Sequence, residues 1–107
     1  RTAYISLSQE ELDKHNFKKG DTEGFVNYGL SLDGIVFAVI FIEKENEDLI
    51  KMSFRSKGDF DVNKFARAHF EGGGHINAAG GKSDISLNDT IVKFNEILPQ
   101  YSDQLRK

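Results

Sequence analysis

The chain has 107 residues, which suits one domain with a single hydrophobic core. Hydrophobic residues make up 38% of it, as in globular proteins, and the lack of cysteine excludes disulfides, a thiol nucleophile and zinc–thiolate sites. The longest apolar run, residues 35–42, is too short to cross a membrane, and no signal peptide is visible. We therefore expect a cytoplasmic protein. Because the chain begins at Arg1 without an initiator methionine, we also expect it to be part of a longer protein.

The net charge of −3 is unevenly distributed along the chain. Residues 1–50 carry five basic and ten acidic side chains, whereas residues 51–82 carry six basic and three acidic ones. A local positive surface on an acidic domain suits a small phosphorylated ligand better than a long nucleic-acid duplex. The alternative is that these charges lie on ordinary solvated faces, which we favour for Lys64 and Arg67.

The N-terminal part of the chain predicts a short strand followed by two helices. Residues 3–7 form an apolar stretch of strand type. Ser8 and Glu11 form a capping box, which predicts a helix that reaches about residue 15. Gly20 ends that segment, and the Asp-Thr pair that follows it caps a second helix.

Two neighbouring strands are predicted in the middle of the chain. Residues 35–42 are nearly all β-branched or aromatic, so we expect a central strand that is buried on both faces. After a short charged connection, residues 49–56 alternate between apolar and polar side chains, which indicates an antiparallel partner strand. Lys51, Ser53 and Arg55 share one face of it, a pattern that is expected if this face lines a binding site.

The remainder of the chain predicts a helix, a strand and a further helix. Asp59 or Asp61 caps a helix over residues 62–70, which the glycines after it terminate. Residues 77–85 return as a strand, and Ser86 caps a final amphipathic helix that the single proline breaks or kinks, before a polar tail. These elements predict an α/β or α+β fold, with a small mixed sheet flanked by helices.

Five of the ten glycines fall within residues 71–81, where Gly72, Gly73 and Gly74 precede His75. Glycine has the largest conformational entropy cost of any residue, so three in a row need a physical reason. Successive backbone N–H groups beside an imidazole would make an anion-binding cradle. The alternative is a flexible hairpin or a helix C-cap with spare glycines.

The segment at residues 52–81 reads MSFRSKGDFDVNKFARAHFEGGGHINAAGG. It resembles the signature of the DHH-associated domain, the C-terminal substrate-binding module of DHH phosphoesterases. The length of the chain and its DTEGFVNYGL segment resemble one bacterial branch, the small oligoribonucleases and 3′-phosphoadenosine 5′-phosphate phosphatases. The ordered motifs that carry the resemblance are Arg55-Ser56, Asp61-Val62, Gly72-Gly73-Gly74-His75 and Ala78-Ala79-Gly80.

The resemblance implies that residues 1–107 are one substrate-binding domain, and that a DHH catalytic domain precedes it in the same polypeptide. In this family two manganese ions are bound by Asp and His side chains of the catalytic domain, including an Asp-His-His triplet. No such triplet occurs here, and His15, His69 and His75 have no carboxylate partners at metal-site spacing. We therefore expect this chain to contain no metal ligands and to hydrolyse nothing by itself.

Together, the resemblance and the residue chemistry predict a site that binds short single-stranded RNA or a nucleotide phosphate. Arg55 offers a planar guanidinium for bidentate contact with phosphate. The alternative is that Arg55 forms a surface ion pair. Ser53 and Ser56 offer hydroxyl donors. The alternative for Ser56 is that its hydroxyl only satisfies a turn. The glycine N–H groups and the imidazole would complete the site. Its predicted residues are Ser53, Arg55, Ser56, Gly72, Gly73, Gly74 and His75.

The resemblance leaves other functions open. Cyclic-dinucleotide phosphodiesterases, exopolyphosphatase-like enzymes and RecJ-type exonucleases use the same module. A freestanding RNA-binding domain is a further, non-enzymatic alternative. Asp-His-His motifs upstream of Arg1 would exclude the freestanding alternative.

Overall fold

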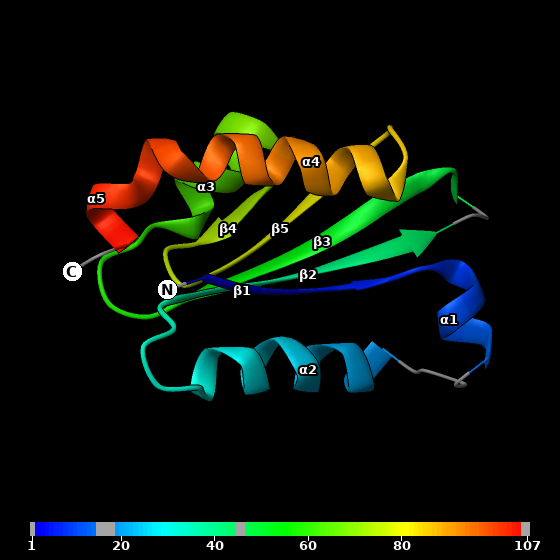
Figure 1. Cartoon of the computed structure of the whole chain (residues 1–107), viewed down its shortest axis with the longest axis horizontal. Coiled ribbons are helices and arrows are strands. Elements are labelled where there is room, and N and C mark those ends of the chain that lie inside the picture. Colours follow the sequence, from blue (N-terminus) through cyan, green and yellow to red (C-terminus); the bar gives the residue numbers. More distant parts are fainter. Residues whose placement is uncertain (1, 15–18, 45–46, 106–107) are drawn as a thin grey trace.

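The computed structural model is a five-stranded mixed sheet between two layers of helices (Figure 1). It describes residues 2–14, 19–44 and 47–105. The strand order is β1-β2-β3-β5-β4, in which β1 runs parallel to β2 and the other neighbours are antiparallel. This arrangement confirms the predicted small mixed sheet flanked by helices. The strands are β1 (Thr2–Leu7), β2 (Phe37–Lys44), β3 (Leu49–Ser56), β4 (Gly73–His75) and β5 (Ala78–Ser83).

The helices divide between the two faces of the sheet. In Figure 1, α3 and α4 lie above the sheet and α2 lies below it. None of the described helices has the length and apolar character that a membrane span needs. The helices are α1 (Gln9–Lys14), α2 (Lys19–Ser31), α3 (Val62–His69), α4 (Leu87–Ile97) and α5 (Ser102–Leu105), with a 3₁₀ helix, η2 (Leu98–Tyr101), between the last two.

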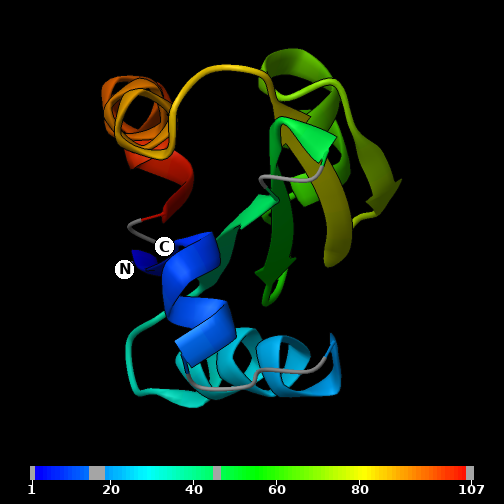
Figure 2. The same cartoon turned by 90° about the vertical axis from the view of Figure 1, so that its right-hand side faces the viewer.

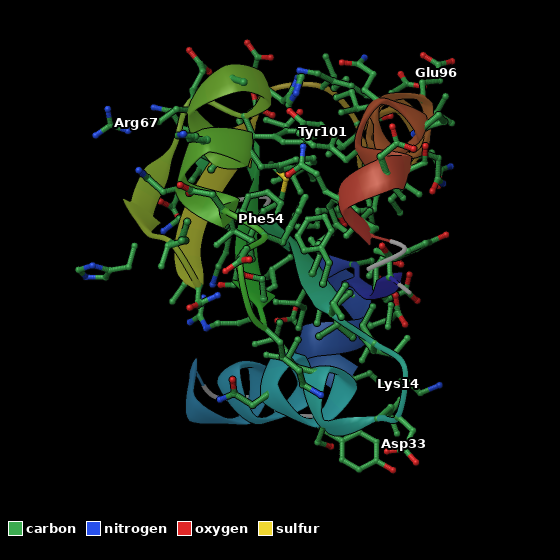
Figure 3. The ribbon with its side chains drawn as sticks, turned by 90° about the vertical axis from the view of Figure 1, so that its left-hand side faces the viewer. Lys14, Asp33, Phe54, Arg67, Glu96 and Tyr101 are labelled. Carbon is green, nitrogen blue, oxygen red and sulfur yellow. The ribbon has the colours of Figure 1, made fainter. Side chains whose placement is uncertain are left out.

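Phenylalanine side chains form the larger core, between the sheet and helices α3 and α4. Phe54 of β3 points into the middle of the molecule (Figure 3), and Phe37 packs against it with ring centroids 6.2 Å apart. On the other face, Ala38 and Ile40 pack in a smaller apolar cluster that includes Val26 of α2. Because both faces of β2 are covered, its sequence is apolar at successive positions, as predicted.

Three helix caps formed as the sequence predicts. The capping box is reciprocal: Ser8 N donates to Glu11 Oε1 at 3.0 Å, and Glu11 N donates to Ser8 Oγ at 3.1 Å. Asp61 caps α3 by accepting a hydrogen bond from Lys64 N at 3.0 Å, and Ser86 caps α4 in the same way. These bonds satisfy N–H groups that have no partner within the helix.

Other predictions of local structure were wrong. Gly20 does not end an element, because α2 begins at Lys19 and includes it. Helix α2 packs against β1, β2 and β3, which offsets the cost of about 1 kcal/mol for a helical glycine. The predicted polar tail instead forms η2 and α5, and Leu105 is buried in the larger core. The predicted end of the first helix, at residue 15, lies outside the described residues.

Candidate phosphate-binding face of the sheet

The sheet register places Arg55 and His75 on the same face. Arg55 of β3 is paired with Ala78 of β5, and Ala78 is paired in turn with His75 of β4. Directly paired residues of antiparallel strands point to the same side of the sheet. These three residues therefore form one cross-strand row, which we call the Arg55 row. Two strand spacings separate the Cα atoms of Arg55 and His75, about 10 Å.

Two more rows lie beside the Arg55 row on the same face. Because side chains alternate along a strand, the next two rows on this face contain Ser53 and Lys51 of β3. We call them the glycine row and the lysine row, and together the three rows are the open face. The glycine row is Ser53, Gly80 and Gly73, and the lysine row is Lys51 and Lys82.

The open face is accessible to a ligand. Lys51, His75 and Lys82 are exposed, and none of the residues in the three rows is buried. Figure 2 shows α2 on this side of the sheet and α3 and α4 on the other side. Helix α2 packs against β1, β2 and β3, whereas β5 and β4 have no comparable helix contact on this side among the described residues.

The chemistry of the open face suits an anionic ligand. Lys51, Arg55 and Lys82 carry positive charge, and His75 adds an imidazole. Between these groups the floor consists of glycine and alanine, which lets a ligand approach the backbone closely. Nη1 of Arg55 donates to Phe54 O at 2.9 Å and to Ala79 O at 3.5 Å, which holds the guanidinium against the sheet.

The structure separates Ser56 from the other predicted site residues. Ser56 lies on the opposite face of β3 and is 5% exposed. Its hydroxyl donates to Phe60 O at 2.6 Å and accepts a hydrogen bond from Asn77 Nδ2 at 2.9 Å. These bonds join the end of β3 to the turns that follow β3 and β4. Ser56 therefore has the turn role that was its alternative.

The three glycines before His75 form no free loop, because Gly73 and Gly74 belong to β4 and Gly72 directly precedes it. Gly72 N donates to Ala66 O at 3.2 Å, and Gly74 N donates to Asn63 Oδ1 at 2.9 Å. Two of the three N–H groups of the predicted cradle thus already have acceptors within the protein. A Cβ atom at Gly74 would lie 2.6 Å from Ala78 O, and one at Gly72 would overlap the backbone of Gly80. The glycines let β4 approach β5 closely.

Asn63 of α3 was missed by the sequence reasoning. Its Oδ1 accepts hydrogen bonds from Gly74 N, at 2.9 Å, and from Nε of Arg67, at 3.2 Å. Arg67 points outward from α3 (Figure 3). One side chain thus ties the edge strand β4 to α3 at the residue before His75. In the sequence, Asn63 looks like an ordinary helix residue.

No metal site is present among the residues that the structure describes. No group of three or more His, Cys, Asp or Glu side chains could hold a metal ion there. His69 lies next to Tyr101, with Nε2 2.7 Å from the hydroxyl oxygen, and His75 lies on β4. The described residues therefore do not fit a manganese centre.

Comparison with known proteins decides the family. The DHHA1 domain family matches residues 2–101 of this chain. The chain belongs to the DHHA1 domain family. This confirms the resemblance to the DHH-associated module of DHH phosphoesterases, in which a DHHA1 domain normally follows an N-terminal DHH catalytic domain.

Two solved structures resemble the fold of this chain. An exopolyphosphatase-related protein from Bacteroides fragilis is 38% identical, with a TM-score of 0.90, and the match covers 98% of this chain and 31% of that protein. An uncharacterized protein from Helicobacter pylori G27 is 22% identical, with a TM-score of 0.54 over 90% of this chain and 24% of that one, and shows the fold alone. This DHHA1 domain therefore spans about a third or less of each. No curated protein matches the chain.

Proposed function

We propose that this DHHA1 domain is the substrate-binding part of a manganese-dependent phosphoesterase that degrades short oligoribonucleotides or dephosphorylates 3′-phosphoadenosine 5′-phosphate. The observation that supports this most directly is the Arg55 row. Arg55 and His75, whose Cα atoms are about 10 Å apart, lie on either side of an alanine on an unburied sheet face. This spacing leaves room for a phosphate together with its sugar.

Arg55, Ser53 and His75 each have a chemical role in this proposal. Arg55 makes a bidentate contact with one phosphate, because its planar fork matches two phosphate oxygens. Ser53, in the next row of β3, donates its hydroxyl to the same phosphate. His75 donates a hydrogen bond to a phosphate oxygen or to the sugar from the other side. Ser56 has no part in this contact.

The bond-breaking chemistry would belong to a DHH catalytic domain in the same polypeptide. That domain would supply the two manganese ions, since the described residues of this chain do not fit such a centre. The role of this chain is to hold the substrate phosphate in front of that domain. By itself it should therefore bind nucleotides and hydrolyse none.

A second candidate is the same module in an exopolyphosphatase-like enzyme. One observation favours it: the Bacteroides fragilis protein that is 38% identical is described as exopolyphosphatase-related. The open face would then bind a chain of directly linked phosphates. The two candidates differ in whether the ligand contains nucleosides.

Titration calorimetry on the 107-residue chain tests the proposal. The ligands are 3′-phosphoadenosine 5′-phosphate, a triribonucleotide, tripolyphosphate and a short RNA duplex. We expect 3′-phosphoadenosine 5′-phosphate and the triribonucleotide to bind more tightly than the duplex and the tripolyphosphate. Tighter binding of tripolyphosphate would favour the second candidate, and tighter binding of duplex would favour a freestanding RNA-binding domain.

Variants then test the residues. Loss of a charge-assisted contact in Arg55→Ala should weaken binding by about 1.5–3 kcal/mol, roughly ten- to a hundredfold in Kd. His75→Ala should also weaken nucleotide binding. Arg55→Lys should bind almost as weakly as Arg55→Ala, because a point charge lacks the planar, bidentate geometry of the guanidinium. Lys64→Ala, an exposed position on α3, is the matched control and should bind normally. Unchanged affinity in a folded Arg55→Ala, His75→Ala double variant would overturn the proposal.

A further inference from the structure

The lysine row brings two positive charges together. Lys51 and Lys82 are directly paired across β3 and β5, and both side chains are exposed. Like charges at directly opposed positions of a sheet destabilise it. Neither lysine belongs to an apolar cluster. An anion that binds between the two ammonium groups would turn this repulsion into attraction.

The lysine row is separate from the Arg55 row. Lys51 lies four residues before Arg55 on β3, which corresponds to about 13 Å along the strand. Nζ of Lys51 lies 3.3 Å from Oε1 of Glu47, a residue that precedes β3. The charged end of Lys51 is therefore directed away from Arg55. The open face therefore has two separate groups of positive charge, and each could bind one anion.

The row between them carries no charge. It consists of Ser53, Gly80 and Gly73, the smallest set of side chains on this face. A polyphosphate chain would place charged groups on this neutral row as well. A phosphodiester chain instead separates its phosphates by an uncharged sugar and base, for which the glycines leave space. The charge pattern of the open face therefore matches an oligonucleotide.

We propose that Lys51 and Lys82 form a second phosphate subsite, which binds another phosphate of the same single-stranded oligoribonucleotide whose first phosphate lies at the Arg55 row. This inference rests on the proposed function, because it takes the Arg55 row as the first subsite. Glu47 competes with the ligand for Lys51. The subsite makes affinity increase with the length of the strand, up to the length that spans both rows.

A chain-length series tests the inference. Mono- to pentaribonucleotides with a terminal phosphate are titrated into the 107-residue chain and into Lys51→Gln, Lys82→Gln and Glu47→Gln, with Lys64→Gln as the control. We expect the unmodified chain to bind the pentanucleotide at least tenfold more tightly than the mononucleotide. Each lysine variant should lose most of this gain, with the loss confined to longer ligands. Glu47→Gln should increase the gain severalfold, since it removes the competing carboxylate.

Salt dependence gives a second measurement. The slope of log Kd against log salt for the pentanucleotide should fall by about 0.7 for each phosphate contact that is lost in a lysine variant. A lysine effect that is equal for mono- and pentanucleotides, or absent from both, would overturn the second subsite. An equal effect on tripolyphosphate would overturn its assignment to oligonucleotides.

The outcomes separate this inference from the proposed function. If the mononucleotide binds through Arg55 but no lysine-dependent gain appears, the second subsite is wrong and the proposed function stands. If a lysine-dependent gain appears that Arg55→Ala does not affect, the Arg55 row is not the first subsite. In that case both proposals fail in their present form.

Discussion

Arg55 and His75 lie in one cross-strand row, on either side of Ala78 and two strands apart. Neither side chain belongs to an apolar core. The sheet places them on one face, because a strand pairing determines both the Cα distance between two residues and the face they share. A ligand that contacts both must lie across β5, over the small side chain of Ala78.

Enlarging Ala78 should therefore block the site without unfolding the protein. A leucine at this position would fill the space between the guanidinium and the imidazole. We expect Ala78→Leu to weaken nucleotide binding at least tenfold, and Ala78→Ser, which adds little volume, to bind almost normally. Circular dichroism controls for folding. If Ala78→Leu binds the nucleotide as tightly as the unmodified chain, the ligand does not cross β5.

Asn63 should control the order of β4 through its acceptor oxygen. Asn63→Ala removes the acceptor of Gly74 N, so we expect faster hydrogen exchange at the Gly74 amide and weaker nucleotide binding. Asn63→Asp keeps an acceptor for both Gly74 and Arg67, and should retain the slow exchange. Exchange rates measured by NMR decide the matter. Equal protection of Gly74 in both variants would show that Asn63 does not hold the strand.

The glycine before β4 should be far less tolerant of a side chain than a glycine in α2. A Cβ at Gly72 would overlap the backbone of Gly80, so Gly72→Ala should cost about 1–3 kcal/mol of unfolding free energy through strain. At Gly24, nothing lies within 4 Å of an added Cβ, and Gly24→Ala should stabilise the protein by about 0.5–1 kcal/mol. Urea denaturation measures both. A neutral Gly72→Ala would contradict the close approach of β4 to β5.

The two serines at the end of β3 should separate stability from binding. Ser56→Ala removes the hydroxyl that donates to the Phe60 carbonyl and accepts from the Asn77 amide, and should cost about 1–3 kcal/mol of unfolding free energy. It should not change nucleotide affinity. Ser53→Ala should do the opposite, with weaker binding and unchanged stability. Denaturation and calorimetry on the same two variants test this, and a Ser56→Ala protein that is fully stable but binds weakly would reverse our assignment.

The unfolding free energy should decrease as the pH falls, because His69 takes up a proton. Nε2 of His69 lies 2.7 Å from Oη of Tyr101. Burial lowers the pKa of His69 below its ordinary value of 6.5, and the Lys93 ammonium lowers it further. The unfolded chain therefore binds the proton more readily than the folded one. This contribution to stability is present above pH 6.5 and is lost as the pH falls through the lowered pKa.

The comparison of His69→Gln with the unmodified chain isolates this effect. Between pH 7.5 and pH 5.5, roughly one pH unit on either side of the ordinary histidine pKa, we expect the unmodified chain to lose more unfolding free energy than the variant. Urea denaturation at both pH values provides the measurement. An identical loss in the two proteins would mean that other groups cause the acid sensitivity.

Local patterns in the sequence determined most of the helices and strands. The capping motifs of Ser8, Asp61 and Ser86 act over three residues, and each formed its predicted bond. The alternation in β3 placed Lys51, Ser53 and Arg55 on one face, because the direction of side chains along a strand follows from a period of two. The same alternation places Ser56 on the other face. Its hydroxyl, which was predicted to contact phosphate, therefore lies on the buried side of the sheet.

The tertiary structure decided which residues meet on the open face. Strand β4 has only three residues, which are too few for a local pattern. Its two glycines do not indicate a strand by themselves, and only the pairing with β5 makes them one. The pairing of Lys51 with Lys82, and of Ala78 with both Arg55 and His75, depends on register between strands. Register depends on contacts between segments that are distant in the sequence. A pattern read along one segment cannot contain it.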